Sequence, residues 1–275
     1  MALGLTSIFY QTTAMATTLP KSIVFITGAF LGNNCWDEWK VYYESKGFFC
    51  MAPAWPHKDP SPEELRNRHP DAGVASNRLS RLVEYFVGII SDLPEKPILI
   101  GHSLGGLIVQ LLLQRRVGAA GVALHSFPPL GTGKYLFYFF AAWRGEMGWF
   151  TSRQKTYMIP FRRWKVAVAN GMTCEQQKEL FYKYATPESK MIVRDGFSCM
   201  AKVDFEKPHA PLLLVSGGRD KIISASVNYR NYLEYKSKGS ITDYREFRNH
   251  NHLIFDMPAW KEDADFVLFW LEGIN

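Results

Sequence analysis

The chain of 275 residues contains only four cysteines, and they form no pattern that would hold a metal ion or a set of disulfides. Cys35, Cys50, Cys174 and Cys199 stand far apart, and none belongs to a Cys-x-x-Cys pair. Closely spaced cysteines and histidines are the usual signature of zinc sites, and dense cysteines are typical of disulfide-stapled secreted domains. We therefore expect reduced thiols, a cytoplasmic location, no metal and no other cofactor.

Neither sign of charge is concentrated in one part of the sequence. There are 32 lysines and arginines against 26 aspartates and glutamates, a net charge of +6, and the basic residues are scattered. Proteins that bind nucleic acids usually gather their basic residues in a patch or stripe. We interpret the mild positive excess as a solvated surface, and we expect a small molecule rather than a nucleic acid as the partner.

Long apolar runs are absent too. A helix that crosses a membrane needs about 20 consecutive apolar residues, and no stretch approaches that length, so we expect no stable membrane insertion. Residues 1–20 are apolar and threonine-rich without a basic residue, whereas a secretory signal begins with basic residues. Three interpretations of this segment stay open: an ordered N-terminal arm, a weak leader, and a true start of the chain at Met15. The sequence does not indicate an oligomeric state.

The sequence does contain the alternating pattern of a globular α/β protein. Hydrophobic residues make up 47% of the chain and charged residues 21%, a balance that allows a sizeable core. Short apolar runs alternate with stretches of helical periodicity, as in parallel sheets covered by helices on both faces. The pattern predicts an α/β fold with about six mostly parallel strands, at residues 21–28, 48–52, 97–100, 121–126, 211–216 and 241–247.

The alternation is interrupted between residues 127 and 203. Aromatic residues crowd together in this stretch, no clear strand is visible, and helices are predicted at residues 175–184 and 188–201. We interpret the stretch as a helical insertion that forms a cap. The predicted domains are an N-terminal arm or leader at residues 1–20, an α/β core made of residues 21–126 and 204–275, and the cap at residues 127–203.

The motif Gly101-His102-Ser103-Leu104-Gly105 joins an apolar strand to an apolar helix. In this context Gly-x-Ser-x-Gly forms a sharp, strained turn that exposes the serine hydroxyl, and the glycines let strand and helix approach closely. The N–H group after the serine lies at a helix N-terminus, where partial positive charge stabilises a developing oxyanion. The motif predicts that Ser103 is a nucleophile. The alternative is a glycine-rich turn in which Ser103 only caps the helix.

A serine nucleophile needs a base beside it and a carboxylate that orients the base. Because the carboxyl ends of parallel strands meet at one edge of a sheet, the partners of Ser103 should directly follow strands. Asp220 follows the strand at residues 211–216, and both His250 and His252 follow the last strand. These positions predict Asp220 as the acid, with Asp204 and Asp195 near the insertion as weaker alternates, and one of the two histidines as the base.

Four segments together resemble the α/β-hydrolase fold family, from about Lys21 to the C-terminus. They are Ile26–Ala29, Gly101–Gly106, Ser216–Asp220 and Asn251–Trp260, the last of which is similar to the family's pattern of a histidine, apolar residues, an acid, a proline and a tryptophan. The resemblance implies that His252 is the base, with His250 as the alternate. It also implies an oxyanion hole made by the backbone N–H groups of Leu104 and Ala29, with Phe30 as the alternate donor.

The sequence departs from the family's pattern in two ways. Thr27-Gly28 stands where the family often has His-Gly, and little chain precedes the first strand, so we expect the family's initial hairpin to be missing. Serine rather than aspartate at position 103 disfavours the chemistry of haloalkane dehalogenases and epoxide hydrolases. His102, next to the serine, is assigned a packing role.

These features predict a serine hydrolase that cleaves a carboxylic ester, or a lactone or amide, of an apolar small molecule through an acyl-enzyme. The aromatic residues between positions 127 and 203 favour an apolar group on the substrate. Two alternatives stay open because one fold supports several functions. One is cofactor-free lyase or perhydrolase chemistry on the same three residues, and the other is a non-catalytic ligand-binding protein.

Overall fold

The computed structural model describes residues 20–132, 155–256 and 260–274. Its centre is a six-stranded sheet in which all neighbouring strands run parallel. The predicted α/β class and the number of strands are therefore confirmed. In spatial order the strands are β2 (Phe49–Met51), β1 (Ser22–Ile26), β3 (Ile98–His102), β4 (Ala120–Leu124), β7 (Leu212–Gly217) and β8 (Thr242–Phe247).

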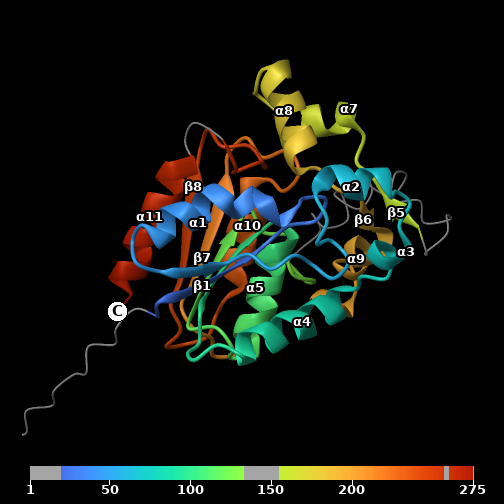
Figure 1. The fold of residues 1–275 in the computed structure, drawn as a ribbon. Helices are drawn as coiled ribbons and strands as arrows, with labels where there is room; N and C mark the ends of the chain where they lie inside the picture. The colour runs from blue at the N-terminus through green and yellow to red at the C-terminus, as the bar shows by residue number, and fades with distance from the viewer. Residues whose placement is uncertain (1–19, 133–154, 257–259, 275) are drawn as a thin grey trace, which may run out of the picture.

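Helices cover both faces of this sheet (Figure 1). On one face lie α1 (Asp37–Glu44) and α11 (Trp260–Gly273), which are joined because the hydroxyl of Tyr43 donates to the carbonyl of Ala264 at 3.0 Å. Strands β1, β3, β4 and β7 are buried along their whole length. Their continuous apolar sequences follow from this double covering, since neither face of these strands meets water.

The opposite face carries α4 (Leu79–Ser91), α5 (Leu104–Gln114) and α10 (Ala225–Glu234). Helix α5 is fixed to α10 by a buried polar contact, in which the amide of Asn231 donates to the side-chain oxygen of Gln110 at 3.0 Å. Two short helices, α2 (Pro62–Asn67) and α3 (Ala72–Ala75), connect β2 to α4. Helix α5 follows β3 directly, so its N-terminus lies at the carboxyl edge of the sheet.

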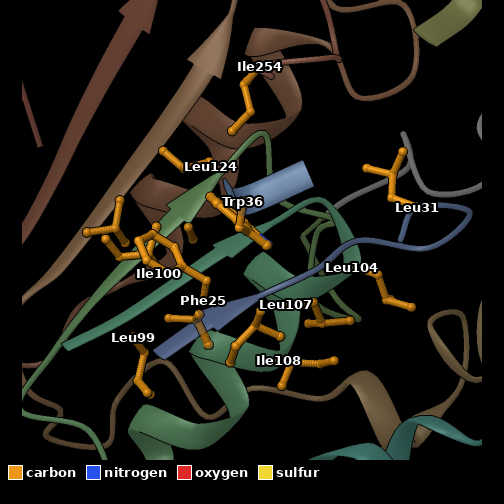
Figure 2. Close-up of a cluster of buried hydrophobic side chains, with 14 of the residues drawn as sticks. Phe25, Leu31, Trp36, Leu99, Ile100, Leu104, Leu107, Ile108, Leu124 and Ile254 are labelled. Atoms are coloured by element: carbon orange, nitrogen blue, oxygen red, sulfur yellow. The ribbon is translucent and has the colours of Figure 1, made fainter. Parts of the chain in front are cut away.

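The hydrophobic core lies on both sides of the central strands. Figure 2 shows Phe25 of β1 beside Trp36, and the two rings stack with their centroids 4.8 Å apart. Leu107 and Ile108 extend from α5 in the same view. The ring of Trp36 also meets Phe255 edge to face, with centroids 4.8 Å apart. The loop that follows β8 is therefore anchored to the core three residues beyond His252.

Between β4 and β7 the chain leaves the central sheet. We call the described part of this stretch, residues 155–203, the insertion segment. In chain order it contains β5 (Thr156–Tyr157), α7 (Phe161–Arg163), the π-helix η2 (Trp164–Val168), α8 (Cys174–Tyr184), β6 (Glu188–Ser189), α9 (Lys190–Asp195) and the 3-10 helix η3 (Cys199–Ala201). Figure 1 shows helices α7 and α8 beyond one end of the strands of the central sheet, and strands β5 and β6 to the side.

Two expectations for this segment need correction. No strand was expected, but β5 and β6 pair in antiparallel orientation. Each is only two residues long, which is too short to show an alternating pattern in the sequence. The helix expected at residues 188–201 is broken, because Ser189 ends β6 and caps α9 by accepting from the N–H groups of Met191 and Ile192. The helix expected at residues 175–184 corresponds to α8.

Within the three described ranges, no helix combines the length and the apolar character that crossing a membrane requires. The predicted N-terminal arm or leader, residues 1–20, lies outside the described residues except for Pro20. The division into a core and a cap stays a prediction.

Candidate active site

Ser103 forms the turn between β3 and α5. Its backbone has φ 55° and ψ −117°, a left-handed φ that is costly for a residue with a Cβ. Two hydrogen bonds to β4 and the segment after it hold this conformation: the N–H of Ser103 donates to the carbonyl of Leu124 at 2.9 Å, and the carbonyl of Ser103 accepts from the N–H of Phe127 at 2.8 Å. The strained turn predicted by the motif is therefore present, and the side chain of Ser103 makes no capping hydrogen bond to α5.

The glycines of the motif are required by the close approach of strand and helix. A Cβ on Gly105 would lie 2.1 Å from the carbonyl oxygen of Ile26 in β1, and a Cβ on Gly101 would lie 2.3 Å from the carbonyl oxygen of Gly105. Both distances are far below contact between a carbon and an oxygen. Helix α5 can therefore start directly against β1 and β3, which places Leu104 beside the loop after β1.

Three side chains from distant parts of the sequence form a hydrogen-bonded chain at this edge of the sheet. Nε2 of His252 lies 3.1 Å from Oγ of Ser103, and Nδ1 of His252 lies 2.8 Å from Oδ2 of Asp220. The other oxygen of Asp220, Oδ1, accepts from the N–H groups of Ile222 at 2.7 Å and Ile223 at 2.8 Å. The structure thus brings together the three residues that the sequence analysis selected for nucleophile, base and acid.

The carboxyl group of Asp220 is buried but remains ionised. Burial by itself raises the pKa of Asp220, but the charge of His252 and hydrogen bonds from His125 and His252 outweigh it, and the pKa lies well below its ordinary value. A carboxylate in this position favours the tautomer of His252 that carries its proton on Nδ1. Nε2 of His252 then has a lone pair available for the hydroxyl of Ser103.

Two further buried histidines, His102 and His125, contact Asp220 or His252, and the sequence did not predict these contacts. Nδ1 of His125 lies 3.4 Å from Oδ2 of Asp220, and Nε2 of His102 donates to the carbonyl oxygen of His252 at 2.8 Å. His102 therefore holds the backbone of His252 in addition to its packing role. The signal that could have found both is their position, because each stands at or directly after the carboxyl end of a strand.

The sequence spacing predicted no metal site, but three histidines come close in space. Ligand atoms of His102, His125 and His252 lie within 4.8 Å of one another. Both ring nitrogens of His252 are directed at Ser103 and Asp220, and Nε2 of His102 is directed at a carbonyl. These contacts orient His252 and leave its ring nitrogens unavailable as ligands of a cation.

His250 does not lie beside Ser103. Its Nδ1 is 3.1 Å from Oδ1 of Asp263 in α11, and its ring stacks on Phe247 with centroids 4.9 Å apart. Burial by itself lowers the pKa of His250, but the contact with Asp263 outweighs it and the pKa lies above its ordinary value. The two candidates for the base are thus separated, because His250 faces α11 and His252 faces Ser103.

One candidate oxyanion donor, Leu104, lies at the start of α5, and the other two, Ala29 and Phe30, lie on the loop after β1. Leu104 is the first residue of α5, so its N–H has no partner within the helix. Ala29 and Leu104 both line the same pocket as Ser103. The N–H of Phe30, the alternate donor, is directed elsewhere, because it donates to Oε2 of Glu188 at 3.4 Å.

The pocket over Ser103 is mostly apolar. The insertion segment contributes Ile159, Trp164, Val168 and Val193, and Ile222 comes from the loop directly after Asp220. Apolar walls around a few convergent polar groups are typical of small-molecule sites. The remaining lining residues are Ala29, Phe30, Leu31, His102, Ser103, Leu104, Phe127 and His252.

Comparisons with solved structures agree with this architecture. A monoacylglycerol lipase from Paleococcus ferrophilus has 20% identity and a TM-score of 0.65, with 94% of this chain and 96% of that chain covered. Polyneuridine aldehyde esterase has 16% identity and a TM-score of 0.65, with 90% of this chain and 98% of that chain covered. Tomato methylketone synthase I in complex with 2-tridecanone has 16% identity and a TM-score of 0.66, with 94% of this chain and 100% of that chain covered. At these identities the likeness concerns the fold.

Sequence comparison identifies the family. No curated protein matches the chain by sequence. The model of one family matches residues 23–264, which span β1 to α11 and include Ser103, Asp220 and His252. The chain therefore belongs to the alpha/beta hydrolase family.

Proposed function

We propose that this protein is a serine hydrolase that cleaves carboxylic esters of apolar small molecules through an acyl-enzyme. The observation that carries the proposal is the chain of contacts from Ser103 through His252 to Asp220, with distances of 3.1 and 2.8 Å, at a strained turn that opens into an apolar pocket. A serine hydroxyl is a weak nucleophile at its own pKa, and this arrangement supplies both the base and the carboxylate that orients it.

The reaction begins when Oγ of Ser103 attacks the ester carbonyl and its proton passes to Nε2 of His252. The carbonyl π electrons move to oxygen and form an oxyanion, which the N–H groups of Leu104 and Ala29 stabilise. Collapse of this intermediate breaks the bond to the alcohol oxygen, and the alcohol leaves with the proton from His252. Asp220 stabilises the positive charge that His252 carries after it accepts the proton of Ser103 and before it gives that proton to the alcohol.

Water then completes the cycle. His252 takes a proton from a water molecule, whose oxygen attacks the acyl carbon bound to Oγ of Ser103. A second oxyanion forms at the same two N–H groups and collapses. The acid leaves, and Oγ regains its proton from His252.

The apolar walls indicate the substrate class. Ile159, Trp164, Val168 and Val193 offer no hydrogen-bonding group that would select a charged acyl or alcohol group, apart from the buried indole N–H of Trp164. The names of the structural neighbours point the same way, since they include a lipase, an esterase and a complex with a long-chain ketone. We therefore propose esters with an apolar acyl or alcohol part in preference to lactones and amides.

The test is hydrolysis of p-nitrophenyl esters of increasing acyl length by the wild type and by Ser103→Ala, with the thermal unfolding of both proteins measured as a control. We expect activity in the wild type and a loss of at least about a thousandfold in the variant. Labelling of the wild type by a fluorophosphonate, followed by peptide mapping to Ser103, checks the nucleophile independently. A folded Ser103→Ala protein with wild-type ester hydrolysis would sink the proposal.

A further inference from the structure

A fully buried ion pair joins the core to the insertion segment beside the loop after β1. Nζ of Lys58, in the loop after β2, lies 2.7 Å from Oε2 of Glu188 in β6, and the side chains are 3% and 0% exposed. Lys58 also lies over the ring of Trp55, 5.0 Å from its centroid. The mechanism proposed above uses neither residue.

The carboxylate of Glu188 contacts the loop after β1 that carries the candidate oxyanion donor. Its Oε2 accepts from the N–H of Phe30 at 3.4 Å as well as from Lys58, and its Oε1 accepts from the N–H of Ser189 at 2.9 Å. Phe30 directly follows Ala29 and has a φ of 67°, a conformation that is strained for a residue with a Cβ. Such a conformation persists only where its surroundings hold it.

Backbone contacts extend the connection along the same loop. The carbonyl of Phe30 accepts from Thr186 at 2.9 Å, and the N–H of Gly32 donates to the carbonyl of Tyr184 at 2.9 Å. Leu31 and Ala185 form an antiparallel bridge between these bonds. The loop after β1 is therefore paired with the insertion segment, and Glu188 completes the pairing at the end nearest Ala29.

Stability alone gives little reason for an ion pair at this place. Removing two charges from water is costly, and a buried pair is often no more stabilising than apolar residues of the same size. What an apolar pair cannot do is accept the N–H of Phe30. Without this acceptor the N–H of Phe30, a half-buried residue, would lose its hydrogen bond to Glu188 and could rotate toward the pocket that Phe30 lines.

We propose that Glu188 is a positioning residue of the oxyanion hole, a role that rests on the function proposed above. It accepts the N–H of Phe30 and holds the loop after β1 in the conformation in which the N–H of Ala29, together with that of Leu104, faces the oxyanion. Lys58 keeps the carboxylate in place. Because Glu188 belongs to the insertion segment, the oxyanion hole is complete only when this segment is docked on the core.

The experiment compares two double variants that both remove the charges, so that neither leaves a buried charge unpaired. Lys58→Met with Glu188→Gln keeps a side-chain oxygen for the N–H of Phe30, and Lys58→Met with Glu188→Leu removes it. For each protein, kcat and KM are measured on one p-nitrophenyl ester. Inhibition is measured with a trifluoromethyl ketone and with the matching methyl ketone. Attack by Oγ of Ser103 on the fluorinated ketone forms a carbon–oxygen bond, transfers the proton of Oγ to His252 and leaves an oxyanion in the hole.

We expect the Leu double variant to lose about 10- to 100-fold in kcat, with KM changed by less than about threefold. It should lose the same factor in affinity for the trifluoromethyl ketone but not for the methyl ketone. The Gln double variant should stay within about threefold of the wild type in all four quantities. A merely structural role would instead affect both double variants, and the binding of both ketones, alike.

A control variant tests whether any change at the insertion segment has this effect. Asp195 in α9 is also a buried carboxylate of this segment that pairs with the core, but it does so at the start of α4 rather than at the loop after β1, through Arg78 at 2.7 Å and the N–H of Leu79 at 3.1 Å. Asp195→Asn should leave the ratio of the two ketone affinities unchanged.

The outcomes separate this inference from the proposed function. A folded Leu double variant with wild-type kcat and wild-type affinity for the trifluoromethyl ketone would overturn the positioning role of Glu188, and so would equal losses in the two double variants. Failure of a fluorophosphonate to label Ser103 in the wild type would overturn the proposed function and this inference together.

Discussion

His125 approaches the same oxygen of Asp220 that His252 contacts. Nδ1 of His125 lies 3.4 Å from Oδ2 of Asp220, and Nδ1 of His252 lies 2.8 Å from that atom. His125 is fully buried, and its backbone has a φ of 47°, so both the packing of the ring and the backbone conformation fix the position of the imidazole. One carboxylate oxygen therefore faces two histidines, of which only His252 also reaches Ser103.

The two contacts of Asp220 should differ in their effect on catalysis. Asp220→Asn removes the charge that selects the tautomer of His252, and we expect kcat to fall by about four orders of magnitude. His125→Asn leaves that contact in place. It removes one of the groups that lower the pKa of Asp220, which lies well below neutral, so we expect a loss of less than about tenfold at pH 7. Initial rates on one ester check both values, and losses of equal size would contradict the assignment.

The close approach at the elbow predicts a difference between two helical glycines. A Cβ on Gly105 would overlap the backbone of β1, whereas a Cβ on Gly88 in α4 meets no atom within 4 Å. We expect Gly105→Ala to lower the free energy of unfolding by about 3 kcal/mol. Gly88→Ala should raise it by about 0.5–1 kcal/mol, because alanine lowers the entropy of the unfolded chain. Urea unfolding measures both, and similar values for the two variants would refute the packing argument.

Two buried histidines should affect stability with opposite dependence on pH. Burial, and then the charges of His252 and His125, lower the pKa of His102 well below its ordinary value. In the unfolded chain His102 takes up a proton below about pH 6.5, which the folded protein resists, so its contribution to stability is present above pH 6.5 and is lost on acidification. The stability difference between the wild type and His102→Gln should therefore shrink as the pH falls from 8 to 5.

His250 provides the comparison for this experiment. Burial lowers its pKa, but the contact with Asp263 and the charge of Glu262 outweigh this effect and the pKa lies above its ordinary value. Its contribution is therefore fully present below about pH 6.5 and is lost as the pH rises through the raised pKa of the folded state. The stability difference between the wild type and His250→Gln should grow as the pH falls from 8 to 5. Unfolding curves over this range decide the sign for each variant.

The pocket predicts which side chain limits the length of the acyl group. Val193 in α9 lines the pocket, whereas Val166 in η2 is 59% exposed. We expect Val193→Trp to lower kcat/KM for a long-chain p-nitrophenyl ester by about tenfold or more relative to the acetate, because the larger ring fills space that the chain needs. Val166→Trp should leave the ratio unchanged. A parallel decrease for both esters in Val193→Trp would indicate a general distortion instead.

Much of this architecture could be predicted from local patterns. The runs at residues 21–28 and 97–100 became β1 and β3 because their continuous apolar character suits a strand that is buried on both faces. The turn at Ser103 was predictable because Gly101 and Gly105 stand where strand and helix meet. Glycine is the one amino acid without a Cβ, and a Cβ has no room at either position. The short strands β5 and β6 were not predictable, since two residues do not form a period.

The candidate site was predictable as a set of types and positions, but not as a set of contacts. The sequence places His250 and His252 in one loop two residues apart, and only the packing of this loop directs one ring to Ser103 and the other to α11. The contact of His125 with Asp220 joins residues about 95 positions apart. The hydrogen bond from His102 to the carbonyl of His252 joins residues about 150 positions apart. Such contacts depend on how the strands are ordered in the sheet, and no local pattern encodes that order.

The α/β class, the strained turn at Ser103 and the order of Ser103, Asp220 and His252 along the chain follow from local sequence, because each depends on the steric and hydrogen-bonding properties of a few neighbouring residues. Long-range packing selects which histidine faces Ser103, and it selects Phe30 as the residue of the loop after β1 whose N–H donates to Glu188. Local patterns do not encode these contacts, because they depend on side chains and backbone groups from distant parts of the chain that compete for the same buried space, where polar groups need hydrogen-bond partners.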